Sequence, residues 1–261
     1  MTTWFLSDIH LKDLKERNGQ TLLRFLFYLN QNPKQHQLFL LGDIFDFWLS
    51  NGRAFIDYYQ PLINEIKKFK DQGGEVYYFE GNHDFHVDVY WTKKLGISVF
   101  EKEEYFKIGN LTVRLEHGDF INSKDVAYLK YREFIRRPYI EFFGHLLPGF
   151  FWKAVGEKLS HKSRRRTANY AIENKEKIQT LIRSYAHVAY AEKPFDLIVT
   201  GHMHIRDFYT FEEASKKITS INLGTWLEKP TALKLENDQL ETVELEIFLS
   251  EELSVGSVSK S

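Results

Sequence analysis

The chain has 261 residues, 43% of them hydrophobic, which is enough for one large domain or for a domain that carries an insertion. It contains no cysteine, so disulfides and thiolate metal sites are excluded, and any metal must bind through oxygen or imidazole nitrogen. The net charge of −1 gives no reason to expect a nucleic-acid partner.

Short apolar runs bounded by polar or turn-forming residues are typical of strands buried between layers. In chain order these runs are Thr3–Leu6, Leu38–Leu41, Val76–Phe79, Leu111–Leu115, Leu197–Val199 and Ile218–Leu223. Two stripes of apolar residues at helical spacing lie among the first strands. They are Leu22, Leu23, Leu26 and Leu29, and then Ile56, Tyr59, Ile63, Ile66 and Phe69. This alternation of strands and helices favours a layered α/β core.

The second half of the chain contains a segment of different character. Residues 122–190 show no strand pattern and are aromatic and basic, so we expect a helical cap inserted into a core formed by residues 1–121 and 191–249. The apolar–polar alternation of Ala232–Leu249 around Asn237-Asp238 predicts a hairpin. Residues 250–261 are polar and small, which indicates a flexible tail.

Metal-binding residue types follow directly after five of the predicted strands. They are Asp8 and His10, Asp43, Asn82 with His83 and Asp84, His117, and His202 with His204. The carboxyl ends of strands in open α/β sheets are where ligands bind. Two divalent cations about 3.5–4 Å apart can hold both sides of a phosphoryl displacement and activate water. A nitrogen and oxygen ligand set without thiolate points to Mn, Fe or Zn.

Individual residues suit particular tasks in such a site. A carboxylate has two oxygens and can bridge two metals, and Asp43 is the candidate for this role. His83 could donate a proton to the leaving oxygen, with Asp84 fixing its tautomer. Asp46 could orient a ligand rather than bind metal itself.

The motifs resemble those of the calcineurin-like metallophosphoesterases. Five motifs match in order: Asp8-Ile9-His10, Gly42-Asp43-Ile44-Phe45-Asp46, Gly81-Asn82-His83-Asp84, His117-Gly118 and Gly201-His202-Met203-His204. The resemblance spans residues 8–204 and implies a four-layer αββα sandwich. It implies that Asp8, His10, Asp43 and His204 hold one metal. It also implies that Asp43, Asn82, His117 and His202 hold the other, and that His83 is the catalytic histidine.

A narrower resemblance is to the UDP-2,3-diacylglucosamine diphosphatases of lipid A synthesis. It rests on Phe47-Trp48 after the second motif, Asp84-Phe85, His117-Gly118-Asp119 and Leu223-Gly224-Thr225-Trp226. Those enzymes carry a helical cap at the same place and usually use manganese. They hydrolyse the pyrophosphate of their substrate to UMP and 2,3-diacylglucosamine 1-phosphate. The resemblance implies the same reaction here, with a hydroxide that bridges two Mn²⁺ ions as the attacking group. Many members have arginine where this chain has His83.

The predicted cap supports a lipid substrate on physical grounds. It joins apolar residues such as Phe142, Phe151 and Trp152 to a basic run, Arg164–Arg166, which suits acyl chains next to phosphate or an anionic membrane face. The opposite interpretation is a packed apolar core with a solvated basic face. By resemblance, the residues that would bind substrate are Asp125, Tyr128, Lys162, Arg165 and Asn169.

Three other functions remain alternatives. They are a calcineurin-like phosphodiesterase or phosphatase acting on a soluble nucleotide or other phosphoester, a non-catalytic scaffold, and a nuclease. The nuclease is disfavoured because basic residues cluster only in the cap. The chain starts without a secretory signal, and no apolar run reaches the roughly 18 residues of a membrane span. We therefore expect a cytoplasmic monomer that acts on a nucleotide glycolipid, peripheral on the cytoplasmic face of the inner membrane.

Overall fold

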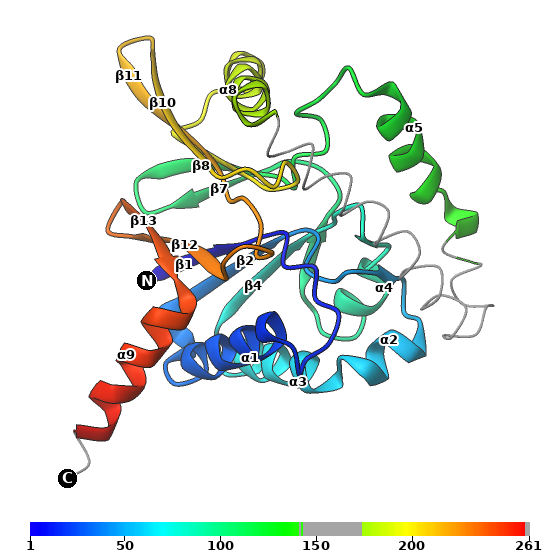
Figure 1. The fold of residues 1–261 in the computed structure, drawn as a ribbon, viewed down its shortest axis with the longest axis vertical. Coiled ribbons are helices and arrows are strands. Elements are labelled where there is room, and N and C mark those ends of the chain that lie inside the picture. The colour runs from blue at the N-terminus through cyan, green and yellow to red at the C-terminus, as the bar shows by residue number, and fades with distance from the viewer. Residues whose placement is uncertain (141, 143–173, 259–261) are drawn as a thin grey trace.

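The computed structural model describes residues 1–140, 142 and 174–258, which form two main β-sheets flanked by helices (Figure 1). The six-stranded sheet has the order β13 (Gln239–Glu244), β12 (Thr231–Glu236), β1 (Thr2–Leu6), β2 (His36–Leu41), β4 (Glu75–Phe79) and β6 (Ser98–Phe100). The five-stranded sheet has the order β10 (Asp207–Glu213), β11 (Lys216–Asn222), β9 (Leu197–Thr200), β8 (Leu111–Leu115) and β7 (Glu104–Ile108). A small third sheet pairs β3 (Trp48–Leu49) with β5 (Asp84–Phe85).

The central strands of both sheets run parallel. In the first sheet β1, β2, β4 and β6 are parallel, with Trp4 opposite Leu38 and Phe39 opposite Tyr77. In the second sheet β8, β9 and β11 are parallel. The carboxyl ends of parallel strands share one edge of a sheet, so the loops after β1, β2 and β4 lie together.

Helices cover the outer faces of both sheets. Figure 1 shows α1 (Arg17–Leu29) and α3 (Gln60–Asp71) on the six-stranded sheet and α8 (Lys175–Glu192) over the other sheet. Other helices of the described residues are η1 (Pro33–Gln35), α2 (Arg53–Tyr58), α4 (Asp88–Trp91), α5 (Val126–Ile135) and α9 (Leu245–Val258). In the described residues no helix has the length and apolar content needed to cross a membrane.

Successive residues of β1 explain why the strands are apolar throughout. Trp4 and Leu6 pack toward α1 and α3, whereas Phe5 packs between the two sheets against Phe39. Burying each such side chain is worth about 1.5–3 kcal/mol. A third core joins Ala186 of α8 to the far face of the five-stranded sheet. The predicted αββα sandwich is therefore confirmed.

All six predicted strands are present, but two other predictions need correction. The second helical stripe belongs to two helices, α2 and α3, because the chain turns at Tyr59 and restarts with Pro61 in the first turn. The predicted hairpin is β12–β13 and ends at Glu244, and the next residue begins α9, which the alternation did not predict. Residues 250–258 of the predicted tail lie in this helix.

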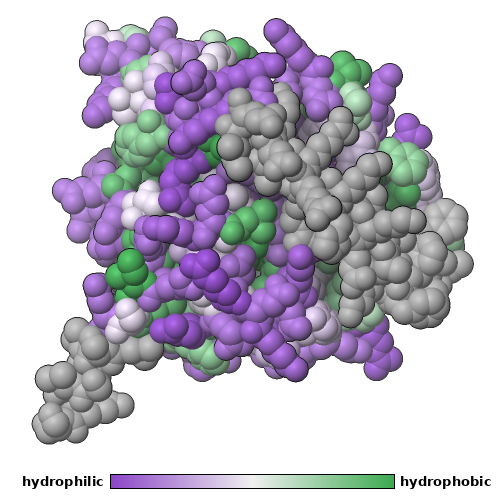
Figure 2. Space-filling model, viewed as in Figure 1, coloured by the Kyte–Doolittle hydropathy of each residue, from purple (hydrophilic) through white to green (hydrophobic). Residues whose placement is uncertain are grey.

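The described parts of the predicted cap contain α5 near its start and α8 near its end. Its middle part, residues 143–173, lies outside the described residues, and the division into core and cap stays a prediction. Outside the grey atoms, the face shown in Figure 2 is mainly hydrophilic, with apolar residues scattered in small areas.

Candidate metal centre

Each predicted metal ligand follows the carboxyl end of a strand. Asp8 and His10 follow β1, Asp43 follows β2, and Asn82 follows β4. In the other sheet, His117 follows β8, and His202 and His204 follow β9. Both sheets therefore contribute ligands to one edge of the sandwich, as the strand pattern predicts.

The backbone of these loops adopts an uncommon conformation. Asp8, His10, Asp43, His202 and His204 all have positive φ, between 50° and 65°. Non-glycine residues rarely occupy this left-handed region, and where they do so together they mark functional sites. These tight turns direct five polar side chains toward the same edge of the sandwich.

Glycine is required next to these ligands because the loops approach each other closely. A Cβ at Gly42, which has φ of 78°, would lie 2.5 Å from Nδ1 of His117. A Cβ at Gly81 would collide with the carboxylate and backbone of Asp43. Any larger residue at either position would push two ligand loops apart.

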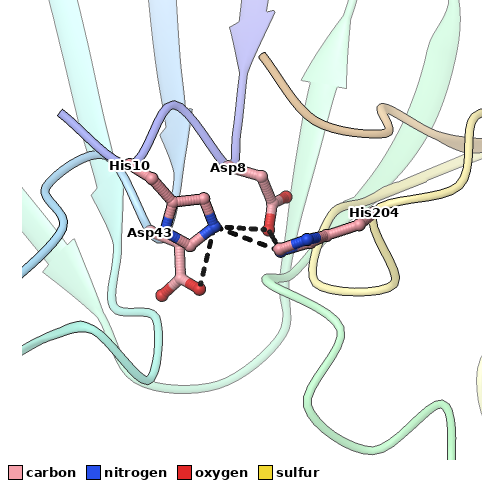
Figure 3. A group of neighbouring side chains, drawn as sticks. All are labelled: Asp8, His10, Asp43 and His204. Carbon is pink, nitrogen blue, oxygen red and sulfur yellow. Dashed lines mark hydrogen bonds and ion pairs between the residues drawn. The ribbon is translucent and has the colours of Figure 1, made fainter. Parts of the chain in front are cut away.

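One set of ligands gathers around His10 (Figure 3). Ligand atoms of Asp8, His10, Asp43 and His204 all lie within 4.8 Å of one another. Nε2 of His204 is 3.1 Å from both Nε2 of His10 and Oδ1 of Asp8. Nε2 of His10 is 3.9 Å from Oδ2 of Asp43. This is the set that the resemblance implies for one metal.

The second set lies on the other side of Asp43. Nε2 of His117 is 3.7 Å from Oδ1 of Asp43, and Nδ1 of His202 is 3.1 Å from the amide oxygen of Asn82. The two oxygens of Asp43 thus face different ligand sets, Oδ2 toward His10 and Oδ1 toward His117. This geometry fits the bridging role predicted for Asp43.

The protonation of the histidines fits a cation site. Nδ1 of His117 donates a hydrogen bond of 2.8 Å to the carbonyl of Leu41, so Nε2 is the nitrogen directed at Asp43, and it has no hydrogen-bond partner among the described residues. Burial opposes protonation of His117, but the carboxylates of Asp43 and Asp119 outweigh it and raise its pKa to about 9. The site therefore favours positive charge at Nε2, and a metal cation would supply it.

Two of the other histidines have the opposite shift, whereas at His204 burial is outweighed by the Asp8 carboxylate, which raises the pKa. Burial lowers the pKa of His202 to about 4 and also lowers the pKa of His10, so both rings are neutral near pH 7. Neutral imidazole is the form that binds metal. With no thiolate present, the nitrogen and oxygen donors suit Mn, Fe or Zn.

Asp119 was named within a sequence motif but was given no role. Its carboxylate forms a third group of potential ligands with His117 and His202, all within 4.8 Å. It is buried and accepts hydrogen bonds from the hydroxyl of Tyr128 and, at 2.5 Å, from Nε of Arg132. Its place two residues after His117 was the available signal.

His83 lies beside the first ligand set. Its ring centroid is 4.9 Å from that of His10, and Nδ1 is 2.9 Å from the carbonyl oxygen of Asp46. A carbonyl only accepts hydrogen bonds, so Nδ1 carries a proton and Nε2 remains for a ligand or a second proton. Asp46, which we expected to orient a ligand, contacts His83 through its backbone.

The predicted pairing of Asp84 with His83 is wrong. The Asp84 carboxylate instead accepts hydrogen bonds from the backbone N–H groups of Asp43, Ile44, Phe45 and Gly81 and from the hydroxyl of Tyr78. One carboxylate thus satisfies the backbone N–H groups of these tight loops. Asp84 therefore stabilises the loops that carry the candidate ligands and does not orient the imidazole of His83.

The predicted substrate residues fall in different places. Tyr128 lies at the second ligand set, with its hydroxyl 3.3 Å from the amide oxygen of Asn82 and its ring 4.9 Å from that of His202. Asp125 caps α5 by accepting a 3.0 Å hydrogen bond from the N–H of Tyr128. The other three, Lys162, Arg165 and Asn169, lie outside the described residues.

Comparison with known proteins adds three kinds of similarity. Residues 1–206 match the model of the calcineurin-like phosphoesterases. The UDP-2,3-diacylglucosamine hydrolase of Vibrio parahaemolyticus is 26% identical over 92% of this chain and 97% of its own. The enzyme of that name from Proteus mirabilis is 25% identical over 94% and 99%. A solved structure described as a novel archaeal phosphodiesterase is 14% identical, with a TM-score of 0.49 over 93% of this chain and 99% of that chain.

Proposed function

The chain belongs to the calcineurin-like phosphoesterase family, and from this premise we propose that it hydrolyses the pyrophosphate of UDP-2,3-diacylglucosamine to UMP and 2,3-diacylglucosamine 1-phosphate. The chain is a metal-dependent phosphoesterase. The observation that carries the proposal is the pair of ligand sets joined by the two oxygens of Asp43. The relatives with this name support the substrate, since they align over more than nine-tenths of both chains.

The ligands divide into two sets by position. Asp8, His10, Asp43 and His204 would hold one divalent cation, and Asp43, Asn82, His117 and His202 would hold the other, with manganese as the proposed metal. Bound cations supply Lewis acidity, which activates water and neutralises charge on the phosphate oxygens. The chain positions these ligands by its left-handed turns and by the hydrogen bond from His117 to Leu41.

His83 is the proposed proton donor to the leaving oxygen. Its Nδ1 is fixed on the carbonyl of Asp46, so Nε2 is the nitrogen that would carry the transferred proton. Asp84 supports this step indirectly, because it holds the backbone of the loop after β2 in place. A positioned general acid typically contributes about 10²–10⁴ in rate.

The beginning of the predicted cap supports contact with acyl chains. Val126, Phe134 and Phe142 expose 56%, 49% and 60% of their surface although they are apolar. Val126 and Phe134 lie on α5, and Tyr128 of the same helix contacts the second ligand set, so α5 joins apolar surface to the candidate site. Such an arrangement suits a lipid whose pyrophosphate lies at the ligands, and a peripheral position at a membrane surface.

The test is a comparison of three substrates with the purified protein and Mn²⁺. They are UDP-2,3-diacylglucosamine, UDP-N-acetylglucosamine, which lacks the long acyl chains, and bis-p-nitrophenyl phosphate. The proposal expects kcat/KM for the lipid to exceed that for the other two at least a hundredfold. Equal values for lipid and sugar nucleotide would show that acyl chains are not recognised, and the soluble phosphodiesterase would then be the better assignment.

A further inference from the structure

The inward face of α5 carries three polar side chains. Tyr128, Arg132 and Arg136 are spaced by four residues, which places them on one side of the helix. All three are directed toward the loops that hold the second ligand set. The exposed fractions of the Arg132 and Arg136 side chains are only 12% and 8%.

Two of these residues converge on Asp119. The hydroxyl of Tyr128 donates to its Oδ1, and Nε of Arg132 donates to its Oδ2 at 2.5 Å. The second arm of Arg132 donates to the carbonyl of Glu101 at 3.0 Å. Asp119 is thereby fixed within reach of His117 and His202.

Arg136 contacts the loop that carries Asn82. One guanidinium nitrogen lies 3.4 Å from the carbonyl of Glu80 and 3.3 Å from that of Gly81, and 3.9 Å from carboxylate oxygens of Glu80 and Asp119. The other two nitrogens are buried and have no hydrogen-bond partner in the described part of the chain. A buried, partly paired arginine contributes little to stability, and apolar residues often replace it without loss. Its presence here therefore favours a role other than stability.

These contacts are confined to one side of the site. They reach Asn82, Asp119 and the backbone before Asn82, whereas Asp8, His10 and His204 form the other side with Asp43. His86 adds another contact between α5 and the segment after β4, because its Nε2 lies 3.0 Å from the carbonyl of Ile135 at the end of α5.

We propose that Arg132 and Arg136 are positioning residues for the second metal ion, acting through Asp119 and the Glu80-Gly81 backbone. The proposal rests on the two-metal site of the proposed function. It means that α5 and the second metal ion are thermodynamically linked: fixing α5 strengthens binding of this ion, and binding of this ion fixes α5. The first ion is not linked to α5 in this way.

The first experiment titrates Mn²⁺ into the metal-free protein and measures unbound Mn²⁺ by its EPR signal. Arg132→Gln and Arg136→Gln are compared with Arg137→Gln, whose side chain is 52% exposed and pairs with Glu133 on the solvent side. We expect one of the two binding steps to weaken at least tenfold in the first two variants, with the other step changed less than twofold. Arg132→Lys should bind the affected Mn²⁺ ion more tightly than Arg132→Gln does, because it keeps the positive charge. It should bind the ion more weakly than the wild type, because lysine lacks the two donor arms of the guanidinium group.

The second experiment uses the unaltered protein and does not depend on a variant that folds. Hydrogen exchange of the α5 amides is followed at zero, one and two equivalents of Mn²⁺. Slower exchange that appears only at the equivalent whose binding step the variants weaken supports the linkage. Equal exchange at all three ratios, or equal weakening of both binding steps in the variants, would overturn it. If the protein binds fewer than two ions, the two-metal proposal fails together with this inference.

Discussion

The carboxylate of Asp84 accepts a 2.9 Å hydrogen bond from the backbone N–H of Asp43, which joins the loop after β4 to the loop after β2. The same carboxylate accepts 2.7 Å and 2.9 Å hydrogen bonds from the N–H groups of Ile44 and Gly81. Two ligand loops about forty residues apart in sequence are thus held by one buried anion. Burial and the nearby Asp43 raise the pKa of Asp84 to about 6.

Replacing Asp84 by asparagine should destabilise the fold. An amide has one acceptor oxygen and would direct an NH₂ group at backbone donors, so we expect a loss of about 2–3 kcal/mol in unfolding free energy. Urea denaturation of the metal-free protein measures this. Asp71→Asn is the control, because Asp71 is 53% exposed and should change stability by less than about 0.5 kcal/mol. Equal effects of the two substitutions would contradict the role of Asp84.

His83→Gln should separate catalysis from metal binding. Because His83 is the proposed proton donor and is absent from both proposed ligand sets, we expect kcat to fall by about 10²–10⁴ while Mn²⁺ content is retained. His187→Gln is the control, since His187 is exposed, hydrogen-bonds to Tyr209 and belongs to neither ligand set. Loss of Mn²⁺ in His83→Gln would instead make His83 a ligand.

Mn²⁺ should stabilise the protein. Without a cation, Nε2 of His117 is buried without a hydrogen-bond partner in the described part of the chain, and it faces Asp43. A ligand present at one hundred times its Kd adds about 2.7 kcal/mol to the unfolding free energy. Thermal unfolding with Mn²⁺ and with EDTA measures the gain, which Asp43→Ala should remove. A Tm that does not respond to Mn²⁺ would argue against the site.

Stability should also depend on pH through His36. Burial lowers its pKa below the usual 6.5, and its Nδ1 accepts a 3.3 Å hydrogen bond from Trp4. A lowered folded pKa means that the unfolded chain binds more protons as pH falls below about 6.5, so stability is lost in that range. Glutamine at this position can accept the same bond without titrating. The stability advantage of the wild type over His36→Gln should therefore shrink between pH 8 and pH 5.5, and a constant difference would exclude this cause.

The strands and the positions of the candidate ligands were predictable because each depends on local sequence. Leu38–Leu41 is apolar throughout because both faces of β2 are buried, and Gly42-Asp43 marks where it ends. The same reasoning located His117 and His202. A buried strand followed closely by a candidate ligand with a glycine next to it is a pattern of a few residues, and sequence reasoning can detect it.

The remaining features depend on contacts between distant segments. Asp84 was paired with its neighbour His83, but its actual donors lie in the loop after β2, which sequence spacing does not reveal. Arg132 and Arg136 carried no prediction, because their contacts with Asp119 depend on how α5 packs against the loop after β8. Helix α9 was missed because its first residues continue the apolar alternation of the hairpin.

Identification of the products tests the central claim most directly. UDP-2,3-diacylglucosamine is incubated with the protein and Mn²⁺, and the products are identified by mass spectrometry, with the Asp43→Ala variant as the control. The account predicts UMP and 2,3-diacylglucosamine 1-phosphate, and neither product with the variant. UDP with the free sugar, or no turnover of the lipid while bis-p-nitrophenyl phosphate is cleaved, would contradict it.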